Sequence, residues 1–138
     1  MSNGTKDLLK MVALVIGVVV VVFLFKQYET EGIKEEAEQR VIHSIEYRVN
    51  GDCESASLTY RNTQGGTEQI HEASLPWSYS NKISKQELDK IFLSISAQND
   101  CRNGSITSSI YVDGNQIKTS KSSGAYVIAS ASTSYPPR

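Results

Sequence analysis

An unbroken apolar run opens the chain between Lys10 and Lys26, over residues 11–25. A helix of this length rises about 22 Å, which is less than a hydrocarbon core of roughly 30 Å. Leu8 and Leu9 extend the run, and the flanking lysines can reach the two interfaces with their ammonium groups. We therefore expect the protein to be held in a lipid bilayer through residues 11–25.

Two other interpretations of this run are weaker. A buried core helix needs a large protein around it, because the run is apolar on every face. The remaining chain is too small to provide one. A cleaved secretory signal needs small residues at its cleavage site, whereas Lys26, Gln27, Tyr28 and Glu29 follow the run. The sequence therefore favours an uncleaved signal-anchor.

Charges around the anchor predict its orientation. Residues 1–10 form a short head with Lys6 and Lys10, whereas residues 26–41 carry five glutamates against three basic residues. Basic residues favour the cytoplasmic side. We expect the head in the cytoplasm, the anchor in the inner membrane and the C-terminal domain in the periplasm. The glutamate, lysine and glutamine content of residues 26–41 predicts a short helical stalk between anchor and domain.

From Ile42 the hydrophobic period changes to two, which is typical of half-buried strands. Alternating segments lie near residues 45–49, 56–61, 68–73, 93–97, 106–112, 116–120 and 126–132. Asp113 and Gly114 form the pair preferred in tight type I′ hairpins. A capping-box spacing at residues 84–87 predicts a single helical turn.

About seven short strands predict an all-β domain over residues 42–132, an immunoglobulin-like antiparallel β-sandwich, followed by a tail at residues 133–138. A small barrel is the alternative. Pro76 cannot donate to a central ladder, so residues 75–78 should form an edge, a bulge or a corner between sheets. The expected structural core includes the inward-facing residues Tyr47, Tyr60, Trp77, Ile110 and Val112.

Cys53 and Cys101 are the two cysteines of the chain, and both lie in the part expected outside the cytoplasm. An even count in an oxidising compartment favours a disulfide. Two free thiols are the alternative. A bridge requires the adjoining strand ends to lie at the same pole of the domain.

Catalytic and metal-binding patterns are sparse in this sequence. His43 and His71 are isolated, without a cysteine or carboxylate at ligand spacing. The sequence contains no nucleophile elbow and no phosphate-binding glycine loop. A net charge of −1 gives no electrostatic footprint for nucleic acid. We therefore expect no enzyme activity, no metal or other cofactor and no nucleic acid, but a tethered module that binds or docks.

Five short segments of the predicted domain stand out as motifs. They are ASLTY at residues 56–60, LPWS at 75–78, LSISAQ at 93–98, IYVDG at 110–114 and GAY at 124–126. Their order and spacing resemble the extracytoplasmic domain of the small mycobacterial membrane proteins, the MmpS family, over about residues 42–131. The resemblance implies an accessory subunit of a polytopic transporter of the RND superfamily, the MmpL type, that acts by contact in the export of lipids or small molecules. A tethered lipid- or ligand-binding sandwich without a transporter is the alternative.

The chain departs from the family pattern in its cysteines. Family members carry cysteines on the strand before the Asp-Gly hairpin and on the last strand, where this chain has Ser108 and Ala129. Any covalent link has therefore moved to Cys53 and Cys101. The content of lysine, isoleucine, asparagine and serine also differs from the family, which bears on the transporter and its cargo more than on the fold.

Three tyrosines are candidate interface residues. Tyr79, Tyr111 and Tyr135 are expected on the solvent side of strands or in loops. Exposed tyrosines suit protein interfaces. An incidental surface position is the alternative for each of them.

Overall fold

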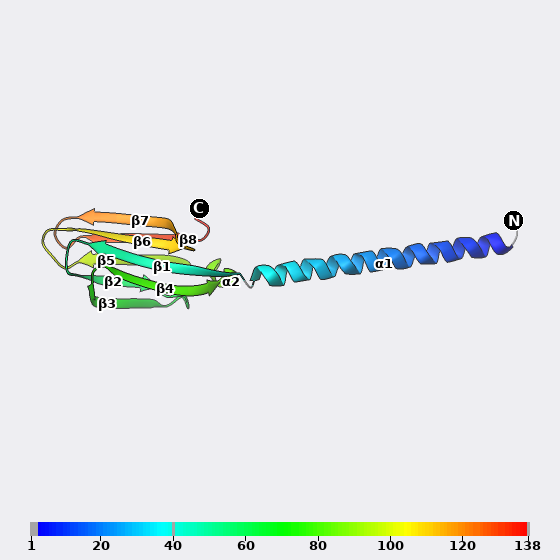
Figure 1. The fold of residues 1–138 in the computed structure, drawn as a ribbon, viewed down its shortest axis with the longest axis horizontal. Helices are drawn as coiled ribbons and strands as arrows, with labels where there is room; N and C mark the ends of the chain where they lie inside the picture. Colours follow the sequence, from blue (N-terminus) through cyan, green and yellow to red (C-terminus); the bar gives the residue numbers. More distant parts are fainter. Residues whose placement is uncertain (1–2, 40, 138) are drawn as a thin grey trace. The chain divides into compact units, whose positions relative to one another are not determined.

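The computed structural model describes residues 3–39 and 41–137. The chain divides into two compact units, Met1–Gln39 and Arg40–Arg138, which run from blue to red along the sequence in Figure 1. Predictions that concern positions 1, 2, 40 and 138 lie outside the described residues.

The N-terminal unit is one helix, α1 (Asn3–Gln39), which continues through the predicted head, anchor and stalk. The large apolar side chains between Met11 and Phe25 are 48–70% exposed. Asn3–Lys34 is long and apolar enough to cross a membrane. Because the run is apolar on every face, it needs a bilayer to cover it, which is consistent with a single-pass anchor.

The described part of the C-terminal unit is a β-sandwich of eight strands in two four-stranded antiparallel sheets. The strands are β1 (Ile42–Gly51), β2 (Ser55–Arg61), β3 (Thr67–Ser74), β4 (Trp77–Ser84), β5 (Phe92–Asn99), β6 (Ser105–Val112), β7 (Asn115–Ser123) and β8 (Ile128–Ser134). Sheet A has the order β4-β1-β6-β7 and sheet B the order β3-β2-β5-β8 (Figure 1). The predicted antiparallel sandwich is confirmed, with a strand order different from that of an immunoglobulin constant domain.

β4 is the strand that the hydrophobic pattern did not show, because the polar Asn81 stands at an inward position between Tyr79 and Ile83 and interrupts the apolar alternation. Pro76 lies in the corner at which the chain leaves β3 in sheet B and enters β4 in sheet A, so of the three arrangements expected for residues 75–78 the structure has the corner between sheets. The helical turn predicted after it is α2 (Lys85–Leu88). The Ser84 hydroxyl accepts from the backbone of Glu87, whose carboxylate accepts from the backbone of Ser84.

Side chains from both sheets fill the space between them. The buried apolar residues are Ile45, Tyr47, Val49, Ala56, Leu58, Ala73, Ile83, Leu88, Leu93, Ile95, Ala97, Ile106, Ile110, Val112, Ala129 and Ala131. Of the predicted core, Tyr47, Ile110 and Val112 are fully buried, and Tyr60 and Trp77 are half-buried against them. Burial raises the pKa of the Tyr47 phenol to about 12, so this group remains neutral in the folded protein.

A disulfide joins Cys53 and Cys101, whose Cα atoms lie 6.0 Å apart. It links the loop after β1 to the loop after β5, so the predicted pairing and the shared pole are confirmed. A Cβ at Gly104 would lie 3.0 Å from the Cys53 sulfur and 3.3 Å from the Cys101 sulfur. The loop therefore needs glycine where it passes over the bridge.

Ser108 and Ala129 take the places where the family resemblance implies cysteines. The buried Ser108 hydroxyl on β6 donates to the Ala129 carbonyl on β8 at 2.9 Å. These two positions are therefore neighbours across the core, one on each sheet. A hydrogen bond joins the two sheets here, and the covalent link lies at a pole.

We expect the disulfide to contribute about 4 kcal/mol to the free energy of unfolding, because the bridge closes a chain separation of 48 residues. Replacing both Cys53 and Cys101 by serine should lower the urea midpoint of the sandwich by the corresponding amount. A reducing agent should lower the midpoint of the wild type and leave that of the double variant unchanged. Equal midpoints for the two proteins under oxidising conditions would contradict this expectation.

Trp77→Ala should lower the free energy of unfolding by about 3 kcal/mol, at the lower end of the range for buried tryptophan. The Trp77 ring lies 5.2 Å from the Tyr60 ring, between centroids, and packs against the core. Urea unfolding measures the loss. Unchanged stability together with lost partner binding would assign Trp77 to an interface instead.

Candidate functional site

A groove of about 600 Å³ lies at the pole of the sandwich where β1 begins, and we call it the N-terminal groove. The start of β1, the short helix α2 with its C-cap, the end of β8 and the segment after β8 line it. The lining residues are His43, Lys85, Asp89, Ser134, Tyr135, Pro136 and Pro137. Lys85 and Asp89 form an ion pair at 3.3 Å, one turn apart on the surface. The groove thus combines an ion pair with imidazole, hydroxyl and ring surfaces.

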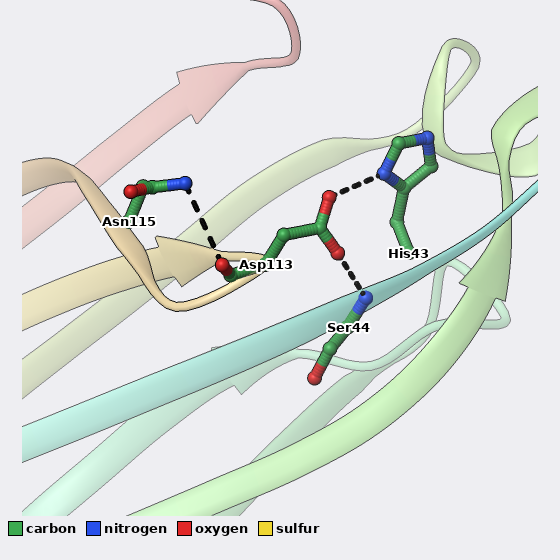
Figure 2. Close-up of polar contacts among 4 residues, drawn as sticks. All are labelled: His43, Ser44, Asp113 and Asn115. Atoms are coloured by element: carbon green, nitrogen blue, oxygen red, sulfur yellow. Dashed lines mark hydrogen bonds and ion pairs between the residues drawn. The ribbon is translucent and has the colours of Figure 1, made fainter.

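His43 is held in this groove by Asp113, from the hairpin between β6 and β7. Figure 2 shows the Asp113 carboxylate between two partners, with Oδ2 lying 2.6 Å from His43 Nδ1 and Oδ1 accepting from the backbone N–H of Ser44 at 2.8 Å. These hydrogen bonds, that of His43 first, hold the pKa of Asp113 below its usual value. Because the ionised carboxylate can only accept, His43 carries a proton on Nδ1.

The type I′ turn places this carboxylate. Asp113 and Gly114 have φ values of 51° and 79°, which are the two positive angles that the turn requires. The predicted hairpin is therefore confirmed. The aspartate side chain points back onto β1, a contact between residues separated by 70 positions that the local pattern does not encode.

The other nitrogen of His43 does not complete a catalytic relay in the part of the chain that the structure describes. Nε2 is buried and has no hydrogen-bond partner there, and the ring lies 5.7 Å from the Tyr135 ring, between centroids. A histidine base needs its nucleophile within hydrogen-bond reach. Among the described residues, no group of three His, Cys, Asp or Glu side chains could hold a metal ion. The geometry thus shows an oriented imidazole whose described contacts are with Asp113 and Tyr135.

The outward face of sheet A carries a second polar group, Glu46, Arg48 and Tyr111, which we call the arginine–tyrosine cluster. Arg48 binds the Glu46 carboxylate through two hydrogen bonds, from Nε at 2.7 Å and from Nη2 at 2.8 Å. Its guanidinium carbon lies 4.2 Å from the centroid of the Tyr111 ring. The hydrogen bonds from Arg48 are the main cause of the lowered pKa of Glu46. Tyr111 itself donates to Gln116 at 3.0 Å.

The outward face of sheet B is different in chemistry. A shallow groove of about 200 Å³ follows β2, β3 and β5. Its lining includes the uncharged polar side chains of Ser57, Thr59, Ser96 and Gln98. The two faces of the sandwich therefore offer different surfaces to a partner.

The three candidate interface tyrosines lie in different environments. Tyr111 lies on the outward face of sheet A, as expected. Tyr79 differs from the expectation of a solvent-side residue, since it lies opposite Tyr47 in the ladder and its ring is stacked on Tyr47 at 6.0 Å and packed on Tyr60 at 4.9 Å. Tyr135 likewise packs against the core beside His43 and is not part of a free tail.

Both polar groups were missed in the sequence because their partners are brought together by strand pairing. The Glu46-x-Arg48 spacing on a solvent-facing strand is visible in the sequence, but the pairing of Glu46 with Tyr111 is a property of the sheet register. His43 and Asp113 meet for the same reason. The structure thus adds partners to residues that looked isolated.

An apolar spanning helix followed by a disulfide-linked sandwich defines a membrane-tethered β-domain protein. The chain belongs to the Mycobacterium membrane protein family, whose family model matches residues 7–134 and so covers both units.

No curated protein matches the chain at a significant level. Among solved structures, a calcium-dependent carbohydrate-binding module is similar at 18% identity with a TM-score of 0.32, over 54% of this chain and 60% of that chain. A similarity at this level carries no argument about ligands.

We expect the Asp113 carboxylate to stabilise the fold in a pH-dependent way. Its pKa is lowered by folding, so its contribution is present above the unfolded value of about 3.9 and is lost as the pH falls through the folded value. The wild type should therefore have a higher urea midpoint than Asp113→Asn at about pH 6, and the difference should shrink as the pH falls below the unfolded value. Asparagine suits the type I′ turn, so the hairpin is kept. A difference independent of pH would contradict the assignment.

Proposed function

We propose that this protein is an extracytoplasmic accessory subunit of a transporter of the RND superfamily, the MmpL type. In this role it acts by protein–protein contact in the export of lipids or small molecules, and it has no enzyme activity of its own. The observation that carries the proposal is the family match over residues 7–134, which covers the apolar helix and the sandwich together. The resemblance of residues 42–131 to the MmpS family supplies the kind of partner.

The disulfide supports a domain outside the cytoplasm. A bridge such as Cys53–Cys101 persists in an oxidising compartment and is rare where thiols are kept reduced. This agrees with the orientation favoured by the charges around the anchor, with the N-terminus in the cytoplasm and the sandwich in the periplasm.

The anchor gives a physical reason for a contact role. A domain tethered to the bilayer is restricted to a thin layer above it, so its effective concentration at a neighbouring membrane protein is high. Modest surface contacts are then sufficient for stable association. The polar groups described above lie on the surface of a sandwich whose interior is filled by side chains.

The second candidate function is a tethered lipid- or ligand-binding module. The N-terminal groove favours it, because about 600 Å³ is within the range of small-molecule sites and the lining mixes charged and ring side chains. This function requires a ligand that remains bound to the purified protein, and native mass spectrometry would detect it.

The full chain should co-purify with one polytopic transporter after crosslinking in the native membrane. A variant in which residues 1–25 are replaced by a cleavable signal should release the sandwich and lower the yield of that transporter strongly, because the tether is lost. Mass spectrometry identifies and quantifies the captured protein. Retention of a lipid without any transporter would support the second candidate and contradict the first.

A further inference from the structure

The two outward faces of the sandwich differ at their central strands. In sheet B the middle of the central strands β2 and β5 presents uncharged polar side chains, with Thr59 opposite Ser96 and Ser57 opposite Gln98. In sheet A the central strands β1 and β6 present the arginine–tyrosine cluster. Arginine and tyrosine are enriched among the residues that dominate binding energy at interfaces, whereas serine and threonine are under-represented.

The arginine–tyrosine cluster is already ordered before any partner arrives. Two hydrogen bonds to Glu46 and the ring of Tyr111 fix the guanidinium of Arg48. A free arginine loses rotamer freedom when a partner immobilises it, and a preordered one avoids most of this loss. The pairing of β6 and β7 also shifts in register between Ile110 and Tyr111. Such irregularities re-aim side chains and are over-represented next to functional sites.

The cluster contributes little to the fold itself. The side chains of Arg48 and Glu46 are 44% and 26% exposed, and ion pairs at this level of exposure add little to stability. The hydrophobic core lies on the other face of the sheet. The cluster can therefore be altered without unfolding the domain.

The charge of this face indicates the chemistry of its partner. Lys82 lies opposite Ser44, and Lys121 lies opposite Thr107, so both lysines share the outward face with the cluster. Among the described residues, three basic side chains of this face, those of Arg48, Lys82 and Lys121, then stand against two acidic ones, those of Glu46 and, at the end of the sheet beside Ser105 and Lys121, Asp52. The excess positive charge is complementary to a protein surface that carries carboxylates.

We propose that the outward face of sheet A, centred on Arg48 and Tyr111, docks onto an acidic surface of the partner transporter. This inference rests on the proposed function and names the surface through which it operates. An anionic lipid surface fits less well, because lipid-binding segments cluster about four to eight basic residues, whereas this face holds three and neutralises one of them with Glu46. A second copy of the chain would place like charges against each other.

The test uses the full chain in its native membrane and compares capture of the transporter across variants. Arg48→Ala and Arg48→Glu should each lower capture at least about tenfold. Arg48→Lys should also lower it, because lysine keeps the charge but loses the two-pronged hydrogen bonding and the stacking. Arg61→Ala is the matched control, since Arg61 is an exposed arginine at the end of β2 in sheet B. Its capture should remain within about twofold of the wild type.

Glu46→Gln separates docking from stability. This variant removes the ion pair as Arg48→Ala does, but it leaves Arg48 in place together with an amide oxygen that can still accept a hydrogen bond from it, so capture should be kept. A photoreactive residue at position 111 should crosslink to a segment of the transporter that contains aspartate or glutamate. The same residue at position 94, on the outward face of sheet B, should not. Thermal unfolding of each variant checks that the sandwich remains folded.

The outcomes distinguish this inference from the function on which it rests. If the wild-type chain captures no transporter, the proposed function fails. If the wild type captures it and the folded variants Arg48→Ala and Arg48→Glu capture it equally well, the docking face fails and the proposed function stands. Crosslinks from position 111 that reach only lipid or a second copy of the chain overturn the inference as well.

Discussion

The exposed apolar surface of α1 is the constraint on which the rest of the molecule depends. The large side chains between Met11 and Phe25 are exposed on every face of the helix, and in water this surface would be strongly unfavourable. A bilayer removes the penalty, and it thereby fixes the sandwich near a membrane.

Strand pairing places polar side chains from distant parts of the sequence next to one another on the surface of the sandwich. Each strand buries one set of alternate residues and presents the other, so cross-strand neighbours become the units of surface chemistry. The pairing of β1 with β6 places Arg48 beside Tyr111. At the end of the same pair, the hairpin returns Asp113 to His43. Two polar groups thus arise on one sheet from residues far apart in the chain.

The two cross-links of the sheets serve different purposes. Ser108 and Ala129 lie face to face across the core and are joined by a hydrogen bond, which a small packed interior accommodates. The disulfide lies at a pole, where it restrains two loops. Gly104 has no Cβ, which leaves room for the two sulfur atoms beside it. The covalent constraint therefore acts on the loops, while packing holds the sheets together.

The sequence by itself determined the apolar helix, the strands with clear alternation, the Asp113 hairpin and the capping box of α2, because each depends on local period or turn chemistry. It favoured a disulfide over two free thiols from the even cysteine count, and the structure decided for the disulfide. It did not determine β4, where Asn81 breaks the apolar alternation, nor the inward position of Tyr79. Only the tertiary structure decided these and the partners of His43 and Arg48. Register and strand order are set by packing between distant segments, and a local pattern carries no information about which segments will pair.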